Sequence, residues 1–399
     1  MKHPFNARAP SFDANAINAT IQRALASAGL DTTTGPMHDV TETIRRVLAA
    51  GQPGEAAPGF DDASVVDAAA RVVVPAGSVP DPARNDAPSA KETRQRPGSF
   101  ETYTFNNAAG ARPYKVYVPA DGSDAPRAVV VMLHGCTQSA DDFAAGTQMN
   151  RLADQHGLLV VYPEQAAHAN ASKCWNWFSP QDQQRGAGEP SLIAGIVGEV
   201  VRNHGADERR VYVAGLSAGA AMAVVMGEAY PEVFAGVGAH SGLPYGSAHD
   251  IPSAMAAMKG GRSGLPAATG RGAGALTPRS KAVQAVPLIV FHGDRDHTVQ
   301  PANGAHIVQQ AHDAHRAQLG DSGLQVTTHS GVAPGGRRFT RTVHADTDGQ
   351  ARIESWTVHG AGHAWSGGHA SGSYTDGKGP DASAEMLRFF LALPRAGSA

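Results

Sequence analysis

Short apolar runs alternate with helical patterns between residues 100 and 393 of the chain. Continuous apolar runs, such as those at 128–133 and 158–162, are typical of parallel strands that are buried on both faces. Further strands are expected at 102–105, 114–118, 211–214, 234–239, 288–291, 338–345 and 351–359, and helices at 192–203, 218–230 and 385–393. This alternation predicts an α/β fold with a mostly parallel central sheet and helices on both of its faces.

The first hundred residues have a different pattern and predict a separate extension. Two short amphipathic helices are expected to start at Asp13 and Asp39. Residues 75–99 are rich in proline, alanine and charge, as linkers are. We therefore divide the chain into a helical, partly disordered extension at 1–74, a linker at 75–99, a main domain at 100–393 and a tail at 394–399. Three possibilities stay open for the extension. It contacts the main domain, it contacts a polymer surface or a partner, or it is weakly ordered.

Composition narrows the choice of partners and compartment. The chain has 33 Lys and Arg against 36 Asp and Glu, and this net charge of −3 gives no electrostatic basis for binding nucleic acid or an anionic membrane. No apolar run has the length of a transmembrane helix, and the first twenty residues contain no apolar signal-peptide core. Secretion through a signal peptide is therefore not supported, which leaves a cytoplasmic location open. The two cysteines do not decide the compartment.

The segment from Gly215 to Gly219 contains the chain's one G-x-S-x-G pattern, with Ser217 at its centre. It follows the strand pattern at 211–214 and precedes an apolar helical segment, so a strand, a sharp turn and a helix are expected in succession. In that setting a side chain at either glycine would clash, and the serine hydroxyl projects from the sheet edge. This is typical of a nucleophile, for which Ser217 is our candidate; a helix-capping serine is the alternative.

A serine hydroxyl is a poor nucleophile and needs an adjacent base, for which the chain offers 18 histidines. His363 stands in a Gly-rich loop after the strand expected at 351–359. Enzymes of the α/β-hydrolase fold take their base from such a loop, and in their chain order the serine precedes the acid and the acid precedes the histidine. We therefore select His363 over its neighbours His359 and His369.

The carboxylate that orients the base should follow a strand between Ser217 and His363. Asp294 and Asp296 both follow the strand expected at 288–291, and we favour Asp296. The pair could also bind a metal, but no further ligands stand at a fitting spacing, so we expect neither a metal nor a cofactor. His292, at the end of the same strand, is interpreted as a residue that stabilises the turn.

Ester chemistry on a serine also needs amide donors for the developing oxyanion. The backbone amide of Ala218, directly after the nucleophile, is one candidate. The other should come from the loop after an early strand, where Gly135 lets the backbone approach closely and the amide of Cys136, or that of Thr137, would point at the oxyanion. A thiol nucleophile at Cys136 is the rival interpretation.

Aromatic residues gather in the segment CWNWF at 174–178. We consider two interpretations of Trp175 and Trp177. They form either part of the hydrophobic core or a substrate-binding wall that grips apolar or ring-bearing groups. Trp365, two residues after His363, would line the same cleft in the second case.

Taken together, these segments resemble the esterase family named for polyhydroxybutyrate (PHB) depolymerase, which also contains feruloyl-esterase-like enzymes. The matching pieces occur in family order over residues 100–393 and are LHGCTQ (133–138), CWNWF (174–178), GLSAGAAMA (215–223), HGDRDHTVQP (292–301), GAGHAWSGG (360–368) and GSYTDGKGPDASAEMLRFF (372–390). The resemblance implies an α/β-hydrolase fold, the triad Ser217, Asp296 and His363, and an oxyanion hole formed by the amides of Cys136 and Ala218. It also implies a disulfide between Cys136 and Cys174.

The activity that this resemblance implies is serine-dependent hydrolysis of carboxylic esters of the polyester, short-chain or aromatic type. A feruloyl or acetyl esterase, a thioesterase or peptidase on the same fold, and a catalytically idle binding module are the alternatives. Secreted depolymerases imply an extracellular location, whereas no signal peptide is visible in this chain.

Overall fold

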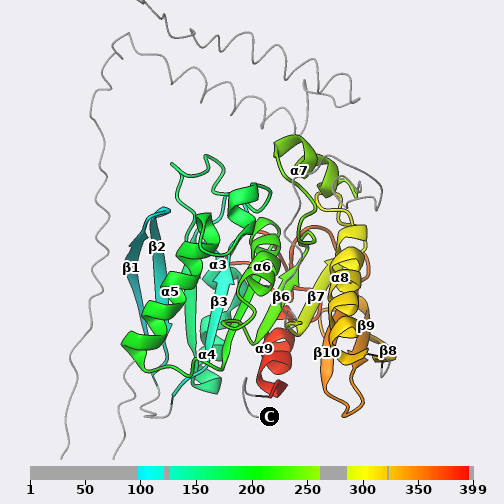
Figure 1. The fold of residues 1–399 in the computed structure, drawn as a ribbon. Helices are drawn as coiled ribbons and strands as arrows, with labels where there is room; N and C mark the ends of the chain where they lie inside the picture. The colour runs from blue at the N-terminus through cyan, green and yellow to red at the C-terminus, as the bar shows by residue number, and fades with distance from the viewer. Residues whose placement is uncertain (1–97, 121–125, 261–284, 321–322, 395–399) are drawn as a thin grey trace, which may run out of the picture. The chain divides into compact units, whose positions relative to one another are not determined.

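The computed structural model describes residues 98–120, 126–260, 285–320 and 323–394. The predicted N-terminal extension, nearly all of the predicted linker and nearly all of the predicted tail therefore lie outside the described residues. The described main domain is built around one large sheet of ten strands, and Figure 1 shows helices α5, α6 and α8 lying across one face of it.

The middle of the large sheet is parallel and its edges are antiparallel. Six adjacent strands run in the same direction, in the order β4 (Leu159–Pro163), β3 (Val129–Leu133), β5 (Val211–Leu216), β6 (Gly236–His240), β7 (Leu288–Gly293) and β10 (Ala351–Val358). A hairpin of β1 (Ser99–Asn107) and β2 (Gly110–Val118) joins β4, and β9 (Arg338–Ala345) and β8 (Gln325–Val332) follow β10. The predicted fold class is confirmed.

Two hydrophobic cores lie on opposite faces of the sheet, because successive side chains of a strand point to opposite sides. On β3, Val129, Val131 and Leu133 belong to the first core, while Val130 and Met132 belong to the second. The first core is covered by α5 (Gly188–His204), α6 (Ala218–Ala229) and α8 (Ala302–Leu319). The second is covered by α3 (Ala140–Thr147), α4 (Met149–His156) and α9 (Ala382–Ala392).

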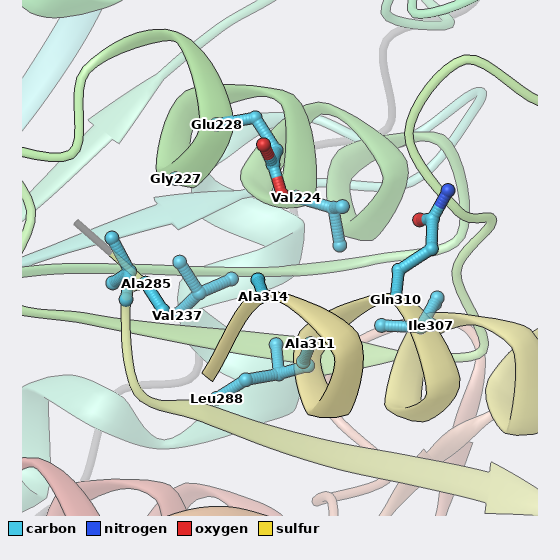
Figure 2. Close-up of a pocket in the computed structure, with 11 residues that line it drawn as sticks. Val224, Gly227, Glu228, Val237, Ala285, Leu288, Ile307, Gln310, Ala311 and Ala314 are labelled. Carbon is cyan, nitrogen blue, oxygen red and sulfur yellow. The ribbon is translucent and has the colours of Figure 1, made fainter. Parts of the chain in front are cut away.

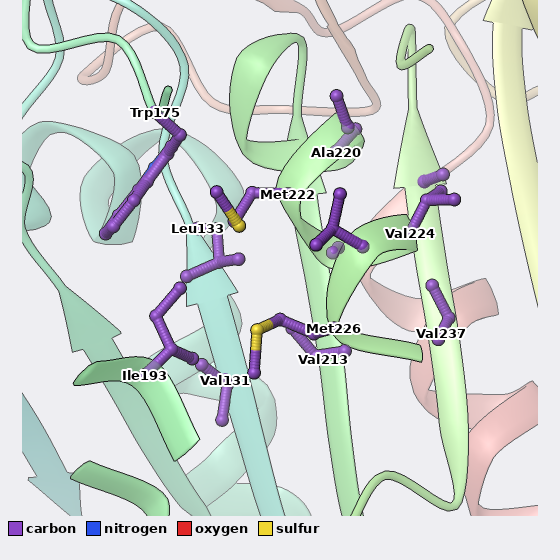
Figure 3. Packing of buried hydrophobic residues seen from close by; sticks show 14 of the residues in the cluster. Val131, Leu133, Trp175, Ile193, Val213, Ala220, Met222, Val224, Met226 and Val237 are labelled. Atoms are coloured by element: carbon purple, nitrogen blue, oxygen red, sulfur yellow. The ribbon is translucent and has the colours of Figure 1, made fainter. Parts of the chain in front are cut away.

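Helix α6 lies at the centre of the first core, directly after β5. Figure 3 shows Met222 and Met226 of α6 beside Leu133 and Val131 of β3. Ten of the twelve residues of α6 are buried, so this helix is apolar on nearly all sides. Such complete burial fixes the position of the β5–α6 turn, where Ser217 lies.

Short elements complete the connections at the two ends of the strands. They are the 3₁₀ helix η1 (Pro180–Gln183), helix α7 (Ile251–Met258), and a two-stranded parallel ribbon of β11 (Trp365–Ser366) and β12 (Thr375–Asp376). Across the described ranges, none of the helices combines the length and the apolar character that crossing a membrane requires.

Candidate active site

Ser217 occupies the sharp turn between β5 and α6. Its backbone has φ 57° and ψ −119°, an unfavourable conformation for a residue with a side chain. The flanking glycines explain how the chain packs there. A Cβ on Gly219 would lie 2.0 Å from the carbonyl oxygen of Leu133, and one on Gly215 would lie 2.4 Å from the backbone of Gly219. The clash predicted for both glycines is confirmed, and a side chain at either position would force the backbone of this turn to move.

The side chains of His363 and Asp296 are hydrogen-bonded to each other. Nδ1 of His363 lies 2.7 Å from Oδ2 of Asp296. The other carboxylate oxygen accepts the backbone amides of Thr298 at 3.0 Å and Val299 at 2.9 Å. Asp296 is only 1% exposed, so its carboxylate is held rigidly in the turn after β7. The structure thus brings together two of the three predicted residues through a direct contact.

The carboxylate of Asp296 stays ionised in spite of its burial. Burial alone would raise its pKa, but hydrogen bonds from His292 and His363 outweigh that effect and hold the pKa of Asp296 well below its usual range. His292 Nε2 lies 2.9 Å from the carbonyl oxygen of Val299 and 3.5 Å from Oδ2 of Asp296. These contacts agree with the expected role of His292 in stabilising the turn.

Asp294, the alternative acid, belongs to a different pair. Its Oδ2 lies 2.9 Å from Nδ1 of His359, and its Oδ1 accepts the amide of Gly360 at 2.7 Å. The second ring nitrogen of His359 contacts the hydroxyl of Thr340 at 2.9 Å. Both nitrogens of His359 are thus engaged, and the choice of Asp296 as the partner of His363 agrees with this geometry. Nδ1 of His369, the other alternative base, is hydrogen-bonded to the hydroxyl of Ser371.

His240, a residue not predicted from the sequence, joins the turn that carries Ser217 to the loop that carries His363. Its backbone carbonyl accepts the amide of Ser217 at 2.9 Å, and its Nε2 accepts the amide of Ser366 at 3.0 Å. The ring is buried and stacks against Trp365, with 5.2 Å between the ring centroids. Burial, reinforced by the charges of His292 and His363, lowers its pKa to about 3, so the ring is neutral. A polar residue at the carboxyl end of an otherwise apolar strand is the signal that could have found it.

A disulfide connects the loop after β3 to the aromatic segment. The Sγ atoms of Cys136 and Cys174 are bonded, as the family resemblance implies, and a thiol nucleophile at Cys136 is therefore ruled out in this state. The amide of Thr137 donates to the carbonyl of Ser172 at 2.7 Å. Of the two amides considered for the oxyanion hole in this loop, Thr137 is thus already engaged, which favours Cys136.

The prediction that three tryptophans bind the substrate is wrong, because all three are buried. Trp175, Trp177 and Trp365 are 0%, 6% and 1% exposed, so a substrate could reach almost none of their surface. Trp175 packs in the first core and Trp365 in the second, on opposite faces of the sheet. Indole rings are largely apolar, and each of these two also finds a buried acceptor for its N–H, on the carbonyl of His134 and on Ser383. The core interpretation is the correct one.

A mostly apolar pocket lies away from these residues, between α6 and α8. Figure 2 shows its lining side chains, which include Val224 of α6 and Ile307 and Gln310 of α8. None of the predicted site residues lines it. This pocket is therefore separate from the candidate active site.

Comparisons with known proteins agree on the family. The sequence profile described as "Esterase PHB depolymerase" matches residues 112–316, which is just over half of the chain. Poly(3-hydroxyalkanoate) depolymerase C of Paucimonas lemoignei is 38% identical over 252 residues, which cover 62% of this chain and 57% of that protein. Acetylxylan esterase A of Aspergillus oryzae is 31% identical over 216 residues, which cover 52% of this chain and 68% of that protein.

A solved structure supports the fold. The acetyl xylan esterase from Aspergillus awamori aligns with a TM-score of 0.55 at 21% identity, covering 74% of this chain and all of that chain. Poly(3-hydroxybutyrate) depolymerase of Ralstonia pickettii is 31% identical over 263 residues, covering 63% of this chain and 51% of that protein. The chain thus spans little more than half the length of the two depolymerases. On the profile match and these relatives, the chain belongs to the PHB depolymerase esterase family.

Proposed function

We propose that this chain is a serine carboxylic-ester hydrolase with Ser217 as nucleophile, His363 as general base and Asp296 as the carboxylate that orients it. The observation that carries the proposal is the 2.7 Å hydrogen bond between His363 and the buried Asp296, formed by loops that follow parallel strands. The strained turn at Ser217 follows a third strand of the same parallel set. Catalytic side chains of such sheets lie at the carboxyl ends of the strands.

The proposed reaction is a two-step acyl transfer. Asp296 accepts the Nδ1–H of His363, which leaves Nε2 free to take the proton of the Ser217 hydroxyl as its oxygen attacks the ester carbonyl. The tetrahedral intermediate collapses to an acyl-enzyme, and His363 passes the proton to the departing alcohol. Water then attacks the acyl-enzyme with His363 as base again, which releases the acid and restores Ser217.

Two backbone amides are proposed to bind the oxyanion of each intermediate. The amide of Ala218 lies in the first turn of α6, where helical amides have no acceptor within the helix. The amide of Cys136 is the second donor, and the disulfide to Cys174 restricts the loop that presents it. Fixed donors of this kind stabilise the developing charge without reorganising during the reaction.

The substrate class that we propose is polyester-type or short-chain carboxylic esters. It is supported by the relatives, which are named as depolymerases of poly(3-hydroxyalkanoates) and as acetylxylan esterases. An acetyl or feruloyl esterase is the second candidate, because a feruloyl esterase B of Neurospora crassa is 38% identical over 141 residues. The disulfide between Cys136 and Cys174 supports an oxidising compartment, such as the outside of the cell.

The first test replaces Ser217 with alanine and measures hydrolysis of p-nitrophenyl butyrate. We expect a loss of at least about 1,000-fold, because the covalent route disappears while only the oxyanion donors and binding contacts are left. Circular dichroism would show that the variant is folded. Activity within about tenfold of the wild type would contradict the proposed mechanism.

The second test is a substrate panel on the wild-type enzyme. It compares PHB film, soluble 3-hydroxybutyrate oligomers, short-chain p-nitrophenyl esters, methyl ferulate, acetylated xylan, a thioester and a peptide amide. We expect the highest kcat/KM on the oligomers or on short-chain p-nitrophenyl esters. A preference for the thioester or the peptide would replace the ester assignment with one of the alternatives on the same fold.

A further inference from the structure

Tyr374 is an exposed aromatic residue in a strained backbone conformation. Its side chain is 47% exposed, whereas the four tryptophans of the chain are all buried. Its φ is 51°, in the left-handed region that bulky residues seldom adopt. Strained residues of this kind persist where the surrounding structure fixes them, and they concentrate at functional sites.

Tyr374 lies between two loops of the proposed active site. Its hydroxyl is 3.2 Å from Oγ1 of Thr137, which in turn donates to the carbonyl of Cys136 at 2.6 Å. Its backbone carbonyl accepts the amide of Trp365 at 2.7 Å, two residues after His363. The hydroxyl of Tyr374 is therefore one side chain away from the proposed oxyanion donor Cys136, and its backbone is hydrogen-bonded to the loop that carries His363.

The backbone beside Tyr374 is held firmly. Ser373 donates its amide and its hydroxyl to the carboxylate of Asp142, at 2.9 Å and 2.6 Å. Gln138 donates to the carbonyl of Ser373 at 3.2 Å. The following residue, Thr375, pairs with Trp365 in the β11–β12 ribbon. A fixed, flat and exposed ring loses little conformational freedom on binding, which is the property that makes tyrosine a good contact residue.

We propose that the Tyr374 ring forms a wall of the substrate site and contacts the apolar chain of an ester beyond its scissile unit. This inference rests on the proposed function. The chemistry that fits is a row of methylene and methyl groups, as in an oligomer of a 3-hydroxyalkanoate, packed on the face of the phenol. In this proposal the ring of Tyr374 has the substrate-binding role that was predicted for the three tryptophans, which are buried.

The kinetic test compares two variants of Tyr374 on a long and a short substrate. Tyr374→Ala removes the ring, whereas Tyr374→Phe keeps it and removes only the hydrogen bond to Thr137. We expect Tyr374→Ala to lower the ratio of kcat/KM for a 3-hydroxybutyrate trimer to that for p-nitrophenyl acetate by about tenfold, mainly through KM. Tyr374→Phe should keep this ratio close to the wild-type value. Tyr103→Ala, at an exposed tyrosine of the edge strand β1, is the control, and it should leave kcat/KM unchanged on both substrates.

A binding measurement separates this inference from the proposed reaction. The trimer is titrated calorimetrically into Ser217→Ala and into Ser217→Ala/Tyr374→Ala, neither of which needs to turn over. We expect the ring deletion to raise Kd about tenfold. Equal dissociation constants, or an unchanged kinetic ratio in Tyr374→Ala, would overturn the role of Tyr374. Failure of the wild type to hydrolyse either ester, with the difference in Kd intact, would instead refute the proposed function alone.

Discussion

At the scale of single residues, His240 is the feature that ties the candidate site together. The backbone carbonyl of His240 accepts a hydrogen bond from the amide of Ser217, and its ring accepts one from the amide of Ser366, in the loop that follows His363. The ring can do so only while Nε2 is unprotonated, and its burial favours that neutral form. The relative position of Ser217 and His363 therefore depends on a buried imidazole that does not itself take part in the proposed chemistry.

Replacing His240 tests this positioning role. His240→Phe keeps an apolar ring in the stack but leaves the buried amide of Ser366 without an acceptor, at a cost of about 1–3 kcal/mol. His240→Gln retains an acceptor near the position of Nε2. We expect kcat on p-nitrophenyl butyrate to fall about 10- to 100-fold in His240→Phe, because small displacements of catalytic groups are costly, and to fall less in His240→Gln. A folded His240→Phe with wild-type kcat would refute the role.

The two neighbouring aspartates provide a matched pair of substitutions. Asp296→Asn should lower kcat by on the order of 1,000- to 10,000-fold, because an amide can donate to Nδ1 and stabilise the wrong tautomer of His363. Asp294→Asn should stay within about tenfold of the wild type, because Asp294 contacts the partly exposed His359 instead. Steady-state kinetics on p-nitrophenyl butyrate decides between them, and the reverse order of effects would show that the acid is Asp294.

Sequence reasoning found some of these residues and missed others for a physical reason. Ser217 is signalled by its own neighbours, since the glycines around it are required by local packing. His240 has no such signal, because its ring acts on Ser366, which is distant in sequence. The prediction for the tryptophans failed because a cluster of aromatics looks the same in the sequence of a core and of a binding wall.

At the scale of secondary-structure elements, the β5–α6 turn depends on close contact with β3. Gly219→Ala would place a Cβ 2.0 Å from the carbonyl oxygen of Leu133, against backbone that cannot move aside. We expect a loss of at least about 2 kcal/mol in the free energy of unfolding. Urea denaturation followed by circular dichroism measures it, and an unchanged midpoint would contradict the packing described here.

Gly198→Ala, in helix α5, is the control for that substitution. The nearest atom to its new Cβ is the guanidinium of Arg202 at 3.2 Å, the end of a flexible side chain that can shift. Because alanine favours helix over glycine by up to about 1 kcal/mol, the control should be neutral or stabilising. A loss in Gly198→Ala as large as in Gly219→Ala would mean that any added methyl group is harmful.

The disulfide is a second link between elements. It joins residues that are 38 positions apart, and closing a loop of that size restricts the unfolded chain. We expect Cys136→Ala/Cys174→Ala to lose about 2–4 kcal/mol in the free energy of unfolding. It should also lose part of its activity, because the loop that carries the amide of residue 136 is less restrained. The wild type treated with reductant should behave like the variant. Full stability and activity in both would remove the disulfide from this account.

The elements themselves were predictable where burial leaves a simple pattern. The central strands are continuous apolar runs, and their predicted positions agree with the structure to within a few residues. Helix α8 was not named in advance, because polar or small residues such as Asn303, Gly304 and His315 occupy its buried positions. Strand β8 is almost entirely exposed, so it has no apolar alternation to detect.

At the scale of the whole molecule, the order of the strands assembles the candidate site. The neighbouring parallel strands β5, β6, β7 and β10 are followed or ended by Ser217, His240, Asp296 and His363. The four residues come from widely separated parts of the chain and lie at the carboxyl ends of these neighbouring strands. No local pattern of the sequence encodes that order; it follows from the crossover connections and the packing of the two cores.

The buried histidine also makes the stability of the fold sensitive to acid. His240 has a pKa of about 3 in the folded protein against 6.5 ordinarily, so between these pH values the unfolded chain binds a proton that the folded chain does not. The contribution of His240 to the free energy of unfolding is thus at its full value above pH 6.5 and falls as the pH drops towards 3. The lowered pKa of Asp296 also reduces the free energy of unfolding on acidification, at still lower pH.

This dependence can be measured by comparing urea midpoints of the wild type and His240→Gln across that pH range. We expect the wild type to lose stability more steeply on acidification, because the variant lacks the group that protonates on unfolding. Other groups, such as the buried Glu189 with its pKa raised to about 7, titrate in both proteins and cancel in the comparison. Parallel curves would show that His240 does not titrate as described.

The central claim is that Ser217 is made nucleophilic by His363 and Asp296, and covalent labelling tests it most directly. The chain is treated with a fluorophosphonate probe, digested and analysed by mass spectrometry. We predict one label per chain, on Ser217, with labelling much slower in Asp296→Asn and absent in Ser217→Ala. A folded wild-type protein that takes no label, or takes it on another residue, would contradict the account.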